Sequence, residues 1–280
     1  MSHQNSGKKC GRLFLTFTLT LCAILLTVTN ARAAEHEDFD SYKIRISGNW
    51  FYSSPTGSLQ GSADSGKIDI QRDLGFASYS TFGGKADWKF TRKNHLYFGA
   101  SVFDQTRRRT LTRDFTFQGQ PFTAGLTVNA ELKSLIFAAG YQYDIIRRKR
   151  GHLGLGIQAD IFDSTGTINA AAQAGNANVA GSAKGSFVVP LPVAGPQYRL
   201  YLTDSPRVFI EGDIYGMYFF GYGNFISTSN SIGVTINRHF SALAGYSLGS
   251  RLVVNNSSSN KRIGVQLTQK GPTAGVQVSF

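Results

Sequence analysis

The chain ends in the stretch GPTAGVQVSF, at positions 271–280, and this stretch carries the pattern that decides the fold. Apolar side chains occupy every second position, at Ala274, Val276, Val278 and Phe280, and small or polar residues lie between them. Successive side chains of a β-strand point to opposite faces. The alternation therefore predicts a strand with one apolar face and one polar face.

The same alternation recurs along the chain, at residues 42–52, 82–90, 153–161 and 242–248. In each segment one face is apolar, and the other holds Gly, Ser, Gln or isolated charges. After residue 33 no apolar stretch approaches the roughly 20 residues of a membrane helix. The sequence therefore predicts an all-β protein.

Composition narrows the class of protein. Aromatic residues make up 12% of the 280 residues and charged residues only 16%, against about 25% charged residues in a typical soluble domain. Many aromatics with few charges fit a surface that does not face water everywhere. The net charge of +12 could indicate a protein that binds nucleic acid. Nucleic acid is nevertheless an unfavoured partner, because the chain is expected to be exported and has no predicted basic helix.

The N-terminal segment has the order of parts of a secretory signal peptide. Basic residues precede an apolar run over residues 13–29, and the small-x-small site Ala31-Arg32-Ala33 follows. An uncleaved membrane anchor is the alternative, but the threonines inside the run and the cleavage site favour removal. We expect a signal peptide over residues 1–33 and a mature domain over residues 34–280.

The links between the predicted strands alternate in length. Short links occur at residues 92–94, 148–151, 203–206 and 237–239, and longer links at 53–66, 105–126, 163–185, 221–224 and 255–260. Transmembrane β-barrels have this wiring, with tight periplasmic turns and longer outer loops. The predicted strands are 41–53, 67–91, 95–108, 126–146, 152–163, 186–202, 207–220, 225–237, 239–254 and 261–280. Because ten is even, both termini are expected on the periplasmic side.

A soluble β-sandwich or a lipocalin-like barrel is the alternative fold. Its polar faces would meet water and would be rich in Lys, Glu and Thr, whereas the polar faces of this chain hold many Gly, Ser and Gln with isolated charges. The last strand also resembles the signal by which outer-membrane barrels are recognised for insertion, with Val276, Val278 and Phe280 as candidate assembly residues. We therefore predict a transmembrane antiparallel up-and-down β-barrel of about ten strands, with eight or twelve as alternatives, in the bacterial outer membrane.

Four stretches resemble an uncharacterised group of small bacterial outer-membrane barrel proteins. They are Ile68 to Gly75, His95 to Leu111, Phe137 to Tyr143, and Gly271 to Phe280. The resemblance extends over most of the mature chain as a pattern. It implies a fold and a location, and it implies no chemistry.

Charged residues fall on the inward face of the predicted strands. They are Lys43, Arg45, Lys85, Asp87, Lys89, Asp144, Asp160, Arg199, Glu211 and Asp213. Glu211 and Asp213 share one face and could serve acid–base chemistry. The preferred interpretation is an ion-paired network that fills a small lumen, because buried charges must be paired and barrels of this size leave little open space.

No catalytic, metal or cofactor site is predicted. The stretch Gly245 to Gly249 fits the G-x-S-x-G motif, but it lies in a predicted strand and no Asp, Glu or His follows it. His36 precedes the first strand, and His95, His152 and His239 lie in links assigned to the periplasmic side. Both cysteines, Cys10 and Cys22, fall in the predicted signal peptide, which excludes a cysteine-based metal site or disulfide in the mature chain.

Two outer loops have contrasting compositions. The loop at 105–126 carries Arg107, Arg108, Arg109 and Arg113, which could bind lipopolysaccharide phosphates at the outer leaflet or form a solvated charge run. The loop at 163–185 is mostly Ala, Gly and Asn and is expected to be flexible.

Three functions remain open at this point. The first is a non-catalytic barrel with a structural or surface-interaction role, its lumen mostly filled by side chains. The second is a narrow passive channel, and the third, least favoured, is a hydrolase or acyltransferase at the outer rim. Expected partners are outer-membrane lipid, lipopolysaccharide and the barrel assembly machinery, and the sequence assigns no oligomeric state.

Overall fold

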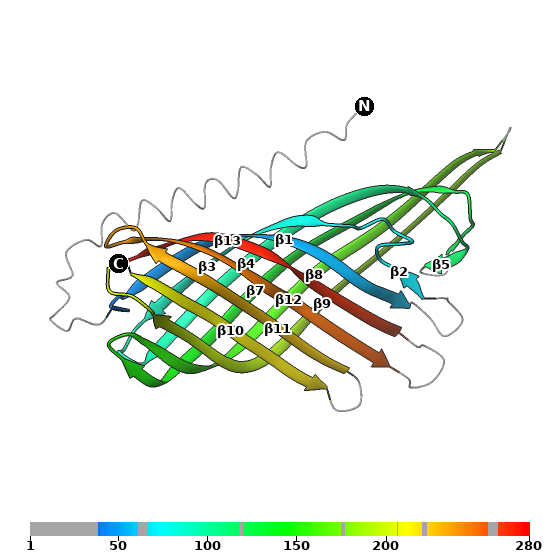
Figure 1. Cartoon of the computed structure of the whole chain (residues 1–280). Helices are drawn as coiled ribbons and strands as arrows, with labels where there is room; N and C mark the ends of the chain where they lie inside the picture. The colour runs from blue at the N-terminus through cyan, green and yellow to red at the C-terminus, as the bar shows by residue number, and fades with distance from the viewer. Residues whose placement is uncertain are drawn as a thin grey trace. The chain divides into compact units, whose positions relative to one another are not determined.

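The computed structural model describes residues 39–60, 67–117, 120–174, 177–205, 207–219, 223–256 and 263–280. Ten long strands form one closed antiparallel barrel, because β13 pairs with β1 (Figure 1). They are β1 (Ile44–Gln60), β3 (Tyr79–Lys89), β4 (Asn94–Thr110), β7 (Thr127–Arg148), β8 (Gly151–Ala174), β9 (Ala177–Tyr201), β10 (Val208–Phe219), β11 (Gly223–Thr235), β12 (Phe240–Asn256) and β13 (Ile263–Ser279). The predicted all-β barrel is confirmed.

The wall has an apolar outer face, as the alternation predicted. On β8 the outward residues from Leu153 to Ile161 are exposed, and Ile157 is 63% exposed. At about 3.3 Å per residue and a typical tilt of about 40°, residues 153–161 span roughly 20 Å of barrel height, most of the ~25 Å apolar band of outer-membrane barrels. Exposed aromatics lie beside one another on this face, where Trp50 of β1 pairs with Phe82 of β3.

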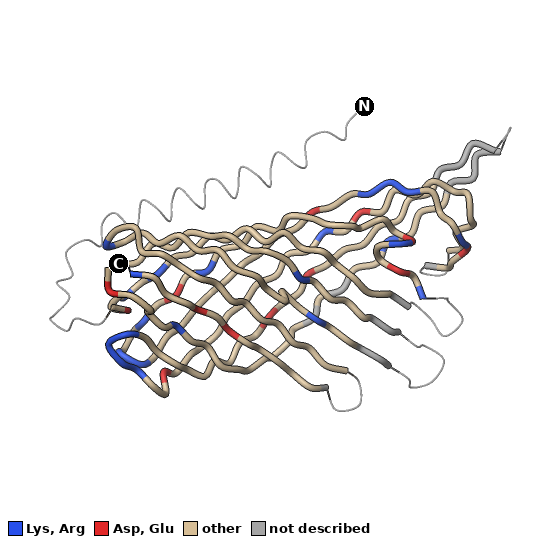
Figure 2. The backbone as a smooth tube through the Cα atoms, viewed as in Figure 1, with Lys and Arg blue, Asp and Glu red and all other residues tan. Residues whose placement is uncertain are grey.

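One end of the barrel carries the short connections, and we call it the turn end. Its turns lie between β3 and β4, β7 and β8, β9 and β10, and β11 and β12. Figure 2 shows Lys and Arg in these turns. The start of β1 and the end of β13 lie at this end too, because Arg45 pairs with Ser279. In the turn between β7 and β8, Gly151 has a φ of 145°, and a Cβ there would lie 2.0 Å from the carbonyl oxygen of Arg199.

The opposite end, the loop end, has a small apolar core of its own. Three short strands lie there: β2 (Ile68–Asp69), β5 (Phe115–Phe117) and β6 (Gln120–Phe122). Their buried side chains, with those of the adjoining segments, pack on the inward faces of β7, β8 and β9. The members of this loop-end core are Ile68, Ile70, Leu74, Phe76, Leu111, Phe115, Phe122, Val128, Ala130, Ile168, Ala170 and Ala183.

Two predicted segments are corrected. The predicted strand 67–91 is interrupted, because Asp69 accepts hydrogen bonds from the backbone N–H groups of Gln71 and Arg72 and closes a turn. The loop at 163–185 is not irregular over its described residues, because β8 and β9 continue through it as a paired hairpin. Its Ile168 and Ala183 are buried in the loop-end core, which explains why β8 and β9 extend through a stretch of small residues.

The predicted signal peptide, Cys10, Cys22 and His36 lie outside the described residues. Within the described part of the chain, no helix is long and apolar enough to cross a membrane.

Candidate functional site

The segment just before β1 enters the lumen at the turn end. The backbone N–H of Phe39 donates a hydrogen bond to the carbonyl of Lys149 (3.0 Å), and its ring packs edge-on against Tyr201 at 5.7 Å. The cations of Lys149 and Arg207 lie over the same ring, at 5.6 and 4.6 Å from its centre. These contacts hold residue 39 against the barrel wall and place the next residue, Asp40, inside.

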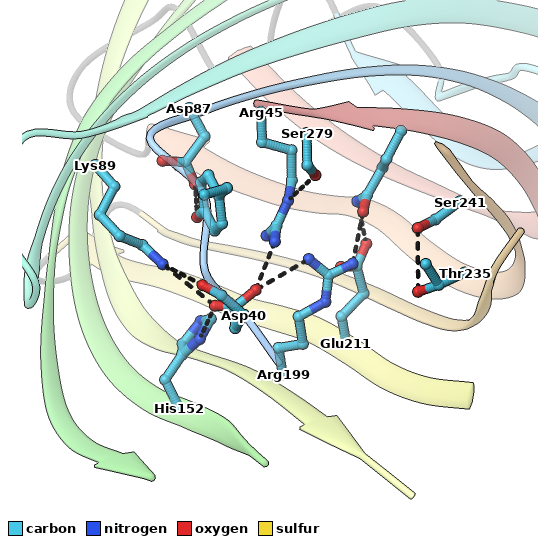
Figure 3. A network of polar contacts seen from close by, with 12 residues as sticks. Asp40, Arg45, Asp87, Lys89, His152, Arg199, Glu211, Thr235, Ser241 and Ser279 are labelled. Atoms are coloured by element: carbon cyan, nitrogen blue, oxygen red, sulfur yellow. Dashed lines mark hydrogen bonds and ion pairs between the residues drawn. The ribbon is translucent and has the colours of Figure 1, made fainter. Parts of the chain in front are cut away.

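Asp40 is 2% exposed, and its side chain is surrounded by cations (Figure 3). Its Oδ1 lies 2.5 Å from Nη2 of Arg45 and 3.4 Å from Nη1 of Arg199. Its Oδ2 lies 2.9 Å from Nδ1 of His152 and 3.4 Å from Nζ of Lys89.

The backbone carbonyl of Asp40 is held as well. It accepts hydrogen bonds from Nζ of Lys89 (2.9 Å) and from Nη2 of Arg147 (3.1 Å). Burial alone would raise the pKa of the Asp40 carboxyl, but Arg45, Lys89 and His152 together hold this pKa well below its usual range. Asp40 is therefore a carboxylate fixed by side chains of five strands.

A second cluster lies beside it and is centred on His95, which is fully buried. Its Nδ1 lies 3.2 Å from Oδ1 of Asp87, and its Nε2 lies 3.1 Å from Oδ2 of Asp144. The Tyr42 hydroxyl donates to Oδ2 of Asp87 at 3.0 Å and lies 3.2 Å from the histidine Nδ1. Asp144 also accepts a hydrogen bond from Arg147 at 3.1 Å. The histidine thus bridges two wall carboxylates.

Arg199 carries the network to the far side of the lumen. Its Nη2 lies 3.0 Å from Oε2 of Glu211 and donates to Oε1 of Gln277 at 2.6 Å. The Gln277 amide donates in turn to Glu211 at 2.8 Å. Arg199 also lies over the ring of Phe209 at 3.9 Å. Glu211 is therefore occupied by an ion pair, which favours a packing role over acid–base chemistry for the Glu211–Asp213 pair.

A cavity of about 280 Å³ adjoins this network inside the barrel. Tyr42, Arg45 and Arg199 line it, and so do Lys85 and Asp213. The last two come from β3 and β10, which lie on opposite sides of the ten-stranded ring. The walls are mostly polar, so water is the natural content of this space.

Beyond the cavity, tyrosines and apolar side chains fill the lumen. The hydroxyls of Tyr97 and Tyr215 lie 2.5 Å apart across it, and the amide of Gln197 donates to both. The Lys85 ammonium lies over the ring of Tyr97 at 4.2 Å. Buried side chains from β4, β9, β10 and β11 form one cluster here: Tyr97, Leu191, Val193, Tyr215 and Phe225. We call this cluster the tyrosine belt.

The structure brings most of the predicted inward charges together and changes the membership of the set. Arg45, Asp87, Lys89, Asp144, Arg199 and Glu211 share the network at the turn end, Lys85 and Asp213 line the cavity, and Asp160 binds Gln158 at 2.5 Å. The prediction that Lys43 faces inward is wrong. Lys43 is exposed in a bend before β1, because the strand begins only at Ile44.

Four members of the network were not predicted from the sequence: Asp40, His95, Arg147 and His152. His95 and His152 are the first residues of the predicted strands 95–108 and 152–163 and were grouped with the adjoining links, whereas the structure places both inside β4 and β8. Both histidines fall on the inward parity of their strands, and this signal was available. No sequence signal pointed to Asp40, which precedes the first alternating segment.

The four loop arginines separate into two pairs. Arg113 donates to Asp73 through Nε at 3.1 Å, and Arg107 donates to the carbonyl of Ser78 at 3.2 Å. Although burial opposes it, the hydrogen bonds and charge of Arg113 lower the pKa of Asp73, and the Asp73 carboxylate raises the pKa of Arg113. Arg108 and Arg109 are exposed and make no ion pair within the described part of the chain.

Comparisons with known proteins bear on the fold. No family model matches the chain, and no curated protein matches it in sequence. Among solved structures, the outer membrane protease OmpT from Escherichia coli superposes with a TM-score of 0.52 at 11% identity, over 88% of this chain and 100% of that one. The fold is that of an outer-membrane β-barrel.

Two further outer-membrane barrels match less closely. The transport unit of the autotransporter AIDA-I from Escherichia coli has a TM-score of 0.43 at 9% identity, covering 92% of this chain and 97% of that one. The translocator domain of NalP from Neisseria meningitidis has a TM-score of 0.38 at 11% identity, covering 98% of each. At these identities the likeness concerns architecture alone.

Proposed function

We propose that this protein is an integral outer-membrane barrel with a structural or surface-interaction role, and that it does no catalysis. The observation that carries the proposal is the filled lumen. The Asp40 network occupies the turn end, and the tyrosine belt crosses the lumen further along. A lumen occupied by paired charges and packed side chains supports a barrel that presents its outer surface and loops rather than an open pore.

The apolar band on the outer wall supports a membrane location. It has the height that outer-membrane barrels need, and the basic turns lie at one edge of it. With the predicted cleaved signal peptide, the turn end faces the periplasm and the loop end faces outward in this proposal. Exposed charges on the outer wall, such as Asp104 and Lys133, mark where the apolar band ends toward the loops.

The positions of the histidines argue against a His-dependent enzyme at the outer rim. Such an enzyme needs its base within hydrogen-bonding distance of the nucleophile or water. His95 and His152 lie in the network at the turn end, and His239 lies in a turn there. Among the described residues, the side-chain hydrogen-bond partners of His95 are a tyrosine and two carboxylates, and none of them is a Ser or Thr hydroxyl.

Recordings in planar bilayers test the filled lumen. We expect purified full-length protein to show no stepwise conductance, because the charge network and the tyrosine belt both obstruct the path. Protease protection of the same preparation in vesicles would establish that the barrel is inserted. Stable, uniform conductance steps from inserted protein would contradict the proposal.

A surface-interaction role is supported by Arg108 and Arg109, which stay exposed at the loop end. Guanidinium groups bind phosphate bidentately, so we propose lipopolysaccharide phosphates as their partners. Changing both residues to Gln should weaken binding of lipopolysaccharide to the detergent-solubilised barrel. Arg113→Gln is the matched control, since Arg113 already binds Asp73. Equal losses in both variants would count against a specific contact.

A narrow passive channel is the second candidate, and the cavity beside Lys85 and Asp213 favours it. A channel would require the Asp40 segment and the tyrosine belt to move aside. The bilayer recordings distinguish the two candidates directly.

A further inference from the structure

We propose that the turn end of the barrel contains a binding site for a small carboxylate, and that the chain's own Asp40 occupies this site as an internal ligand. The site is independent of the proposed role, because it would exist equally in a closed barrel and in a gated channel. It adds a ligand class that the fold alone does not assign.

The site belongs to the barrel wall and not to the segment that fills it. Its cations project from separate strands: Arg45 from β1, Lys89 from β3 and Arg199 from β9, with His152 from β8. Each strand is fixed by its neighbours in a closed barrel, so the backbone positions from which these side chains project do not depend on residue 40. Asp40 lies outside every strand, and on its C-terminal side residues 41–43 join it to the start of β1.

The contacts match a carboxylate group. The two oxygens of Asp40 are divided between two sets of donors: Oδ1 faces the guanidinium groups of Arg45 and Arg199, and Oδ2 faces His152 and Lys89 (Figure 3). A free carboxylate presents the same two oxygens at the same spacing. The lining of the adjoining cavity by Arg45, His152 and Arg199 leaves room for a substituent on the bound group.

The ion pairs of the network favour an anion at this position. Arg147 is neutralised by Asp144, and Arg199 by Glu211. Arg45 and Lys89 each form an ion pair with Asp40, and their side chains are 10% and 5% exposed. Without Asp40, two buried cations would lose that partner, and a buried charge without a partner is strongly unfavourable. A small anion from solution would relieve this.

Chemical rescue tests the site in the full chain. Asp40→Ala should lower the thermal midpoint of unfolding in detergent, and formate should restore it in proportion to the logarithm of its concentration, as expected for a ligand of the native state. Sodium chloride at equal ionic strength should not. Titration calorimetry should show saturable binding of formate to Asp40→Ala in the millimolar range, the limit for a ligand of about three heavy atoms, and no binding to the wild-type chain.

Matched variants locate the effect. Adding Lys89→Met to Asp40→Ala should abolish formate binding. Asp73→Ala, which removes a carboxylate from the loop end, should not be rescued by formate. Phosphate is the competing anion: rescue by phosphate but not by formate would overturn the carboxylate assignment.

Rescue by formate no greater than that by chloride would overturn the site itself. If Asp40→Ala does not fold alone, its refolding yield is measured with and without formate. A yield raised by formate and not by chloride supports the site, and an unchanged yield contradicts it.

Discussion

Replacing Phe122 by Ala should open the loop end while leaving the barrel intact. Phe122 is 1% exposed on β6, stacks on Phe115 at 5.3 Å, and lies in the loop-end core with Val128 and Ile168. Truncating a buried Phe to Ala costs ~3–5 kcal/mol in a packed core. Because every 1.4 kcal/mol is about tenfold, the lower figure raises the open fraction of the loops by about 100-fold.

Limited trypsin digestion measures this opening. Arg113 is held by Asp73 while the loops are packed, so cleavage after it should report the open state. We expect Phe122→Ala to be cut there far faster than the wild-type chain. The barrel strands should survive, and unheated protein should keep its folded mobility in gels, since the closed sheet has no free edge.

Phe82→Ala is the matched control. It makes the same change at a side chain that is 61% exposed on the outer wall of β3, so it should leave the cleavage rate unchanged. Equal cleavage rates for Phe122→Ala and the wild-type chain would refute the loop-end core. An increase shared by both variants would show a general loss of barrel stability instead.

Three further predictions concern the barrel itself. The pKa of Asp40 is lowered in the folded chain, so the contribution of its carboxylate to stability is present above about pH 4 and is lost as the pH falls through the lowered pKa. The difference in thermal midpoint between the wild-type chain and Asp40→Asn should therefore shrink below pH 4. A difference that stays constant with pH would contradict this. Gly195→Ala should reduce the yield of folded protein, because a Cβ there would lie 1.8 Å from the carbonyl oxygen of Ile214, whereas Gly48→Ala, with open space around it, should fold normally. Deleting Phe280 should slow insertion and lower the amount of folded barrel in cells, and unchanged amounts would show that the terminal aromatic is incidental.

The strands could be predicted from the sequence because the membrane imposes a period of two on the outer face. At 153–161 every outward position is apolar, so both the strand and its orientation are evident. The prediction was weaker where the loops pack on one another. Residues 67–78 look like a strand by composition, but the Asp69 turn interrupts it. Only the pairing of residues distant in sequence shows that the described residues of 163–185 belong to β8 and β9.

The candidate site was partly predictable for the same reason. Arg45 and Arg199 lie on regular strands, and their positions in the alternation predicted that both side chains point inward. Asp40 lies before the alternation begins, and its partners Lys89 and Arg199 are 49 and 159 positions away. A contact over such separations has no local signature, so the centre of the network could be found only from the structure.

Labelling of single cysteines in intact cells tests the central claim, a barrel that crosses the outer membrane with its loop end outward. Thr112 is exposed at the loop end, and Arg92 is exposed in the turn between β3 and β4. A membrane-impermeant thiol reagent should label Thr112→Cys on intact cells and should label Arg92→Cys only after the outer membrane is permeabilised. Labelling of Arg92→Cys but not Thr112→Cys on intact cells would contradict the orientation, and labelling of neither after permeabilisation of the outer membrane would contradict the location.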